Sequence, residues 1–282
     1  MRFQRYTDVD VFVNNVLGIL LEDEVRNNLL ISILVDSNRD KANEWLMSTV
    51  TDDHGVIILI AMCTRPFYLL LSQPGESRCD ITVVEFLASE LKRIGFVPSG
   101  VLAVKELAGS FVNVYCGSRG SRLHMTMTLM RLDEPADHDE APGFCRMLTE
   151  EDLSFAPSWE QAFCVDCRIP VNSLPEIEAR LRARIGMNIH YIWDDGLPVA
   201  QAVFGRSTPN GAAVSWVYTP PEYRGRGYAT SVVAELSKNI LGSGKQFCCL
   251  FADAANPASC AVYHKLGYYD VCLFDEIKFD IS

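Results

Sequence analysis

The chain has 282 residues, of which 49% are hydrophobic and 22% are charged, and its formal net charge is −11. This composition excludes a globally disordered chain and allows one large domain or two of ordinary size. The acidic balance argues against nucleic acid or an anionic membrane as a partner, because both are polyanions.

No segment of the sequence is typical of export or membrane insertion. The first ten residues, MRFQRYTDVD, include acidic side chains before any apolar run of the kind that a signal peptide needs. The most apolar stretch, Val56–Leu71, is interrupted by Thr64, Arg65 and Pro66, so its apolar runs are too short to span a bilayer. We therefore expect a cytoplasmic protein with no membrane partner.

The ten cysteines are expected to be reduced thiols, because no export signal accompanies them. Cys164 and Cys167 form a lone CxxC pair. A structural zinc site needs a second such pair or two suitably spaced histidines, and neither follows. We expect no bound metal.

Hydrophobic periodicity predicts a first α/β domain over residues 1–132, followed by a solvated linker. The linker, 133–143, holds five acidic residues within DEPADHDE and then a proline and a glycine. The elements expected before it are a helical region at Val11–Leu34, strands at Val56–Cys63 and Phe67–Ser72, a helix at Ile81–Ile94, and strands at Val101–Val104, Phe111–Cys116 and Met125–Met130.

A second α/β domain is predicted over residues 144–282. Asp194-Asp195-Gly196 is a hairpin signal between two strands, and Thr149 is a plausible helix cap. The expected elements are a strand that begins at Phe144, a helix at Leu174–Ile185, strands at Ile189–Trp193, Val199–Phe204 and Ala213–Tyr218, a helix at Tyr228–Leu241, a strand at Phe247–Phe251, a helix at Ala258–Lys265, and strands at Tyr269–Leu273 and Ile277–Phe279.

The stretch PPEYRGRGYATSV, Pro220–Val232, joins a predicted strand to a predicted amphipathic helix. Unpaired N–H groups at a helix start attract an anion, and the helix dipole adds to this attraction. Gly225 and Gly227 remove Cβ atoms and so allow a phosphate to approach the backbone, while Arg224 and Arg226 supply charged donors. The stretch lacks the third glycine of a dinucleotide fingerprint. Gly242–Lys245 resembles part of a Walker A loop but is better explained as a turn.

The order Arg-x-x-Gly-x-Ala at Arg224, Gly227 and Ala229 resembles the GNAT superfamily of N-acetyltransferases. A second segment, FADAANPASCAVYHKLGYYDV, strengthens the resemblance, because Asn256 can cap a helix on which Tyr263 precedes Gly267. The resemblance covers residues from about Phe144 to the C-terminus. It implies a mixed α/β sheet of the GNAT type, with residues 1–132 as a degenerate copy in a tandem arrangement.

The resemblance also implies acetyl-CoA as co-substrate and names the residues that would hold it. A splayed strand would bind the pantetheine arm, the loop amides would bind the pyrophosphate, and an N–H at the splay would face the thioester oxygen. The expected contacts are Val217, Tyr218, Thr219, Arg224, Gly225, Arg226, Gly227, Tyr228, Ala229, Thr230 and Asn256.

Tyr263 is the candidate general acid, because a phenol stays protonated at neutral pH and can meet a leaving thiolate. On residue type alone it would be a core tyrosine, which is how Tyr268 and Tyr269 are interpreted. The base stays open, and the residues of suitable type are Glu160, His190, Glu222 and Asp253.

The sequence therefore predicts transfer of an acetyl group from acetyl-CoA to a primary amine, on a small molecule or on an amino group of a larger one. The alternative is a non-catalytic acyl-CoA-binding module. The best phosphate-loop candidate in the first half, CGSRGSRLHM at residues 116–125, lacks the motif order and is interpreted as a turn between strands. A homodimer is left open.

Overall fold

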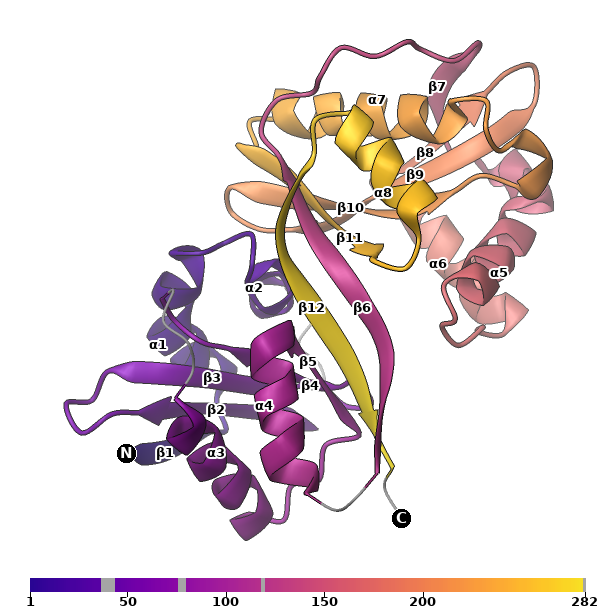
Figure 1. The fold of residues 1–282 in the computed structure, drawn as a ribbon. Coiled ribbons are helices and arrows are strands. Elements are labelled where there is room, and N and C mark those ends of the chain that lie inside the picture. The colour runs from indigo at the N-terminus through magenta and orange to yellow at the C-terminus, as the bar shows by residue number, and fades with distance from the viewer. Residues whose placement is uncertain (37–43, 76–79, 118–119, 281–282) are drawn as a thin grey trace. The chain divides into compact units, whose positions relative to one another are not determined.

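A computed structural model of the chain describes residues 1–36, 44–75, 80–117 and 120–280. The chain forms two compact units, one of residues 1–129 with 271–282 and one of residues 130–270 (Figure 1). This division differs from the expected second domain, 144–282, at both of its ends. The last strand belongs to the first unit because Ile277 and Phe279 are buried in that unit's core.

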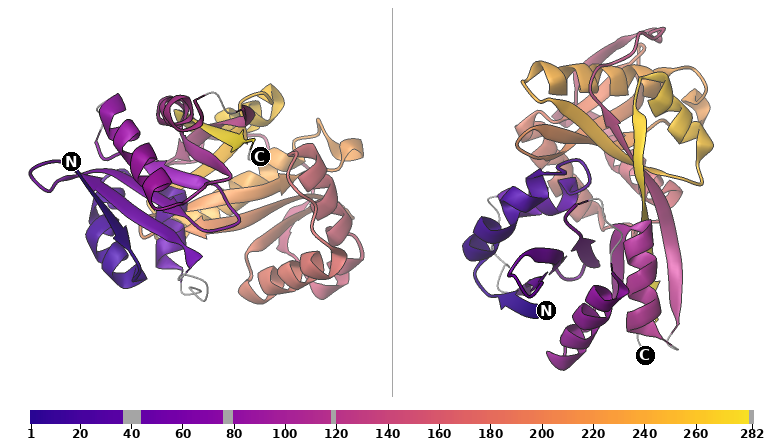
Figure 2. Two further views of the ribbon diagram at one scale, coloured as in Figure 1. Left: turned by 90° about the horizontal axis from the view of Figure 1, so that it is seen from below. Right: turned by 60° about the vertical axis from the view of Figure 1, so that its left-hand side comes forward.

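The first unit is a mixed sheet with helices on both faces (Figures 1 and 2). Its strand order is β1-β2-β3-β4-β5-β12-β6, with β4 and β5 parallel. Its elements are β1 (Arg2–Tyr6), α1 (Val9–Leu21), α2 (Asn28–Val35), β2 (Leu46–Thr51), β3 (Ile57–Cys63), β4 (Leu69–Ser72), α3 (Ile81–Arg93), β5 (Gly100–Val104), α4 (Lys105–Cys116) and most of β6 (Ser121–Leu132) and β12 (Tyr269–Phe279).

Alternating side chains along the strands divide the apolar core of this unit into two layers. Met47, Ile60 and Met62 pack with Phe12 of α1 and Ile31 of α2. The opposite face carries α3 and α4, whose apolar residues recur at helical spacing and pack on strand residues of the other parity.

The second unit repeats this plan. Its strand order is β7-β8-β9-β10-β11, and β10 and β11 are its parallel pair. Its elements are β7 (Phe144–Met147), η2 (Glu150–Ser154), α5 (Ala156–Asp166), α6 (Leu174–Met187), β8 (His190–Asp194), β9 (Pro198–Ser207), β10 (Gly211–Tyr218), η3 (Pro221–Tyr223), α7 (Tyr228–Gly242), β11 (Phe247–Asp253) and α8 (Pro257–Lys265).

The two units share one succession of elements. Each has a first strand, two helices, three antiparallel strands, a helix, a parallel strand and a further helix. A long strand follows in the chain each time, β6 after α4 and β12 after α8, although most of β12 lies in the first unit. The mixed α/β class and the tandem arrangement expected from the sequence are confirmed. Within the described ranges, no helix has both the length and the apolar character needed to cross a bilayer.

Three expectations about individual elements are wrong. The predicted strand Phe111–Cys116 is part of the helix α4, because Leu107, Phe111 and Tyr115 recur every four residues and are buried on one helical face. The 116–125 loop therefore does not join two strands, and its residues 118 and 119 lie outside the described residues. The two predicted C-terminal strands form the single strand β12.

The acidic segment 133–143 has no regular secondary structure, but it is tied to the second unit. The Ala136 amide donates to the Leu266 carbonyl at 2.9 Å, and the Ala141 amide donates to Ser231 Oγ at 2.8 Å. Trp193 Nε1 donates to the Pro142 carbonyl at 2.8 Å. The backbone of the expected linker is therefore anchored, while most of its acidic side chains are exposed.

Candidate active site

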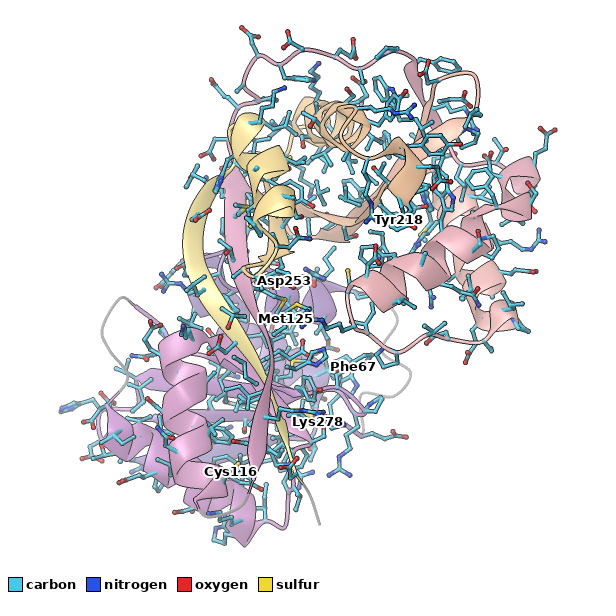
Figure 3. All side chains as sticks on the ribbon, turned by 45° about the vertical axis from the view of Figure 1, so that its right-hand side comes forward. Phe67, Cys116, Met125, Tyr218, Asp253 and Lys278 are labelled. Carbon is cyan, nitrogen blue, oxygen red and sulfur yellow. The ribbon has the colours of Figure 1, made fainter. Side chains whose placement is uncertain are left out.

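Strands β10 and β11 separate toward their carboxyl ends. They pair in parallel only at Gly211–Ala213 with Phe247–Cys249, and in the described residues the rest of β10 lies beyond this paired segment. Tyr218 and Asp253, the last residues of the two strands, are labelled in Figure 3. Val217 and Tyr218, predicted on a splayed strand, lie beyond the last residue of β10 that pairs with β11.

A bulge interrupts β10 at the beginning of this parting. Ser215 is opposite Val203 of β9 and Tyr218 is opposite Gln201, so that one strand carries an extra residue. Trp216 lies within the bulge with φ at +53°, a conformation that non-glycine residues adopt rarely. Backbone strain of this kind is concentrated at functional sites.

The loop after β10 ends at an uncapped helix start. Gly227 is the N-cap of α7, and no side chain caps this helix. Gly225 and Gly227 have φ values of +77° and +86°, so both are needed for the path of the backbone. The first-turn N–H groups of α7 have no intrahelical acceptor by the geometry of a helix, and they attract an anion.

The two arginines of the loop are held by protein groups. Arg224 Nη2 pairs with Asp166 at 2.7 Å, and its Nε donates to the Thr219 carbonyl at 2.9 Å. Arg226 Nη2 donates to the Glu222 carbonyl at 3.2 Å. Both guanidinium groups therefore brace the loop.

Other predicted contacts differ in exposure. Tyr228 and Thr230 are buried in the first turn of α7, and the Tyr228 hydroxyl donates to Asp195 at 2.5 Å. Ala229, between them, is half-buried. Thr219 Oγ1 is buried without a hydrogen-bond partner among the described residues, and an atom of this kind needs a partner.

Asn256 is the N-cap of α8 and Tyr263 lies on this helix, as the sequence predicted. Asn256 caps the helix by accepting a 3.1 Å hydrogen bond from the Ser259 amide. Tyr263 is only 7% exposed and belongs to the core between the sheet and α7. Burial raises its pKa to about 12, so its phenol stays protonated at neutral pH.

Two of the four residues considered as a base are buried and paired. Glu160 on α5 is 1% exposed and forms ion pairs with Arg180 and Arg184 of α6. His190 is also 1% exposed, and burial lowers its pKa to about 3, so it is neutral. Its Nε2 is 3.2 Å from Gln201 Oε1.

The other two candidates are more accessible. Glu222 is exposed on η3, beside the loop. Asp253 is half-buried at the end of β11, and its carboxylate accepts a 2.9 Å hydrogen bond from the Ala255 amide. In the described part of the chain, no hydrogen bond or ion pair joins either side chain to Tyr263.

Sequence reasoning missed the surroundings of Trp216. Arg184 lies 4.5 Å from the centroid of the indole ring, and Phe163 packs against the ring at a centroid distance of 4.7 Å. An aromatic residue at a bulge leaves no distinct pattern in one sequence, because the same letters also describe an ordinary strand.

Comparison with known proteins supports the fold. A model of the FR47-like protein family matches residues 197–274, which contain the loop, α7, β11 and α8. Among solved structures, a GNAT-family acetyltransferase from Colwellia psychrerythraea is 11% identical, covers both chains completely and has a TM-score of 0.59. A GCN5-related N-acetyltransferase from Sphaerobacter thermophilus is 13% identical over 98% of this chain and 95% of its own, with a TM-score of 0.61.

A tandem GNAT protein from the clavulanic acid biosynthesis pathway is 15% identical over 100% of this chain and 99% of its own, with a TM-score of 0.57. No curated protein matches the sequence. The fold is that of the acetyltransferases of the GNAT superfamily. The chain carries this fold as a tandem pair, and residues 197–270 of its FR47-like segment lie in the second unit.

Proposed function

We propose that the second unit transfers an acetyl group from acetyl-CoA to a primary amine. The observation that carries the proposal is the uncapped start of α7, with two left-handed glycines, beside strands that part at their carboxyl ends. The pyrophosphate would bind the amides of residues 225–230. The pantetheine arm would run along Val217, Tyr218 and Thr219, where the buried Thr219 hydroxyl lacks a partner in the described residues. Asn256 would contact the co-substrate.

In the proposed reaction the neutral amine attacks the thioester carbonyl, and a C–N bond forms as the C–S bond breaks. A backbone N–H at the β10 bulge stabilises the negative oxygen of the tetrahedral intermediate. The departing thiolate takes the phenol proton of Tyr263, and the nitrogen loses a proton to water, directly or through a neighbouring base. The phenol recovers its proton from solvent.

Binding without turnover is the second candidate function. It is favoured by the position of Tyr263 within the core and by the ion pairs that occupy Glu160. Acyl-CoA would then be a ligand that stabilises the unit.

Two measurements distinguish these functions. We expect acetyl-CoA to raise the melting temperature, since a ligand that binds only the folded state stabilises it. We also expect a panel of amines and amino acids to cause thioester consumption. Stabilisation without consumption by any amine would support the binding module, and absence of both would refute acyl-CoA as the ligand.

A further inference from the structure

The bulge at Trp216 needs support from outside its own strand. A left-handed backbone is unfavourable for tryptophan, because its Cβ approaches a neighbouring carbonyl oxygen. It persists only where neighbouring groups favour it. Gln201 Nε2 reaches the Trp216 carbonyl at 3.4 Å, which is long for a hydrogen bond, so the main support comes from the side chain.

The Trp216 side chain lies against α5 and α6. Arg184 of α6 lies 4.5 Å and Arg180 lies 5.5 Å from the centroid of the indole ring, within the range of a cation–π interaction. Phe163 of α5 packs against the ring. The side chain of Arg184 is only 7% exposed, so this contact lies in a low-dielectric environment where it is strengthened.

Glu160 fixes Arg184 in this place. Its buried carboxylate accepts from Arg184 Nη1 at 3.1 Å and pairs with Arg180 on its other oxygen. Buried ion clusters of this kind seldom stabilise a fold more than apolar residues of the same volume would. Such ion pairs are better explained by the positions in which they hold their side chains. Here they hold the Arg184 guanidinium against the Trp216 ring.

We propose that Arg184, held by Glu160, is a positioning residue that keeps Trp216 left-handed and so directs the N–H groups of the β10 bulge at the acyl carbonyl. This inference rests on the proposed function. It assigns a role to α5 and α6, which lie on the face of the sheet opposite α7. These helices would fix the backbone of the β10 bulge that binds the oxyanion.

The first test compares Arg184→Lys with Arg182→Lys on the same helix. Lysine keeps the charge but cannot stack as a planar group or span two oxygens. Arg182 pairs with Glu150 at an exposed position, which makes it a matched control. We expect Arg184→Lys to lower kcat tenfold to a hundredfold, on the order expected for a misplaced catalytic group. The affinity for acetyl-CoA should stay within about threefold, because the anion site at α7 is intact.

A second readout does not need activity. We expect hydrogen exchange of backbone amides in residues 214–219 to accelerate about tenfold or more in Arg184→Lys and not in Arg182→Lys, because the bulge opens locally. Trp216→Phe keeps a ring beneath the guanidinium and should retain most of kcat, whereas Trp216→Ala should lose it. This pair also serves as the test if Arg184→Lys fails to fold.

The outcomes separate the two proposals. If the wild-type protein neither binds nor consumes acetyl-CoA, the proposed function is refuted. The role of Arg184 in holding the bulge is then tested only by hydrogen exchange of residues 214–219 in Arg184→Lys and Arg182→Lys. If the wild-type protein is active but Arg184→Lys matches Arg182→Lys in kcat and in exchange, the positioning role is refuted. Retention of wild-type kcat and exchange by Trp216→Ala would refute it as well.

Discussion

The ring of Tyr263 meets the ring of Tyr268 edge-on, with centroids 5.9 Å apart. The Tyr268 hydroxyl is 2.9 Å from Ser237 Oγ, which ties that ring to α7. Tyr263 is carried by α8, the helix that Asn256 caps. Two neighbouring tyrosines of one core therefore belong to different elements, because the Tyr268 hydroxyl is tied to α7 and Tyr263 lies on α8.

Removal of the Tyr263 hydroxyl tests the general acid. We expect Tyr263→Phe to lower kcat by about a hundredfold or more, in the range of general acid–base catalysis, while the affinity for acetyl-CoA changes little. Tyr268→Phe is the matched control and should cost only about 1 kcal/mol of stability. Steady-state kinetics measures kcat, and calorimetric titration measures the affinity for acetyl-CoA. Wild-type turnover in Tyr263→Phe would show that Tyr263 is not the general acid.

The alkaline limit of activity is a further property of the same phenol. The protonated form donates, and burial raises its pKa from 10 to about 12. The contribution of Tyr263 should thus persist to about pH 11 and be lost as the pH rises through 12, not through 10. A loss of activity centred near pH 10 that disappears in Tyr263→Phe would contradict this assignment.

Substitution of Gly227 tests the anion site. Gly227 and Gly244 both have left-handed backbones, so Gly227→Val and Gly244→Val should each cost on the order of 1–2 kcal/mol. Only Gly227→Val should weaken acetyl-CoA binding, because Gly244 lies in the turn after α7. Arg224→Lys, which keeps the charge, should be milder. Equal affinity in the two glycine variants, measured by titration calorimetry, would contradict the site.

Buried His190 predicts acid sensitivity. Its pKa is lowered to about 3 in the folded state, whereas an unfolded histidine titrates near 6.5. The unfolded state then binds more protons between these values, so stability falls as the pH falls from 6.5 to 3, by about 1.4 kcal/mol per pH unit at most. His190→Gln should flatten this part of the curve of unfolding free energy against pH. Exposed His264→Gln is the control, and equal curves for both variants would argue against this origin.

The binding stoichiometry should be one acetyl-CoA per chain. The counterpart of α7 in the first unit is α3, and Asp80 caps it by accepting a 2.9 Å hydrogen bond from the Thr82 amide. In the first unit, a carboxylate therefore occupies the start of α3. The equivalent position in the second unit, the start of α7, is where a phosphate would bind. Titration calorimetry should give one site, and Asp80→Asn should leave its affinity unchanged. Two equivalent sites would show that the first unit is not degenerate.

The glycine-rich loop after β10 could be predicted from the sequence because its signals are local. Two glycines between a strand and an amphipathic helix indicate the turn, and Asn256 before Pro257 indicates the next helix start. The structure has the turn and both helix starts at these residues. Strands and helices with clear periodicity, such as Ile81–Arg93, were found for the same reason.

Other features depend on contacts that a single sequence does not reveal. Residues Phe111–Cys116 carry aromatic and β-branched side chains typical of a strand, yet burial of one helical face makes them part of α4. The bulge at Trp216 and the ion pairs of Glu160 join four elements, and no spacing in the chain connects them. The membership of β12 in the first unit is likewise a long-range pairing, from Phe274–Lys278 to Gly100–Val104.

The pairing of β12 with β5 affects the order in which the two units can be completed during synthesis. Residues 1–129 leave the ribosome without the strand that pairs with β5, and that strand is made only after residues 130–270. Until then β5 has an unpaired edge and the apolar contacts of Ile277 and Phe279 are missing. Nascent chains with such edges are open to pairing with other chains. We therefore expect the first copy of the fold to be completed only after the second has been translated.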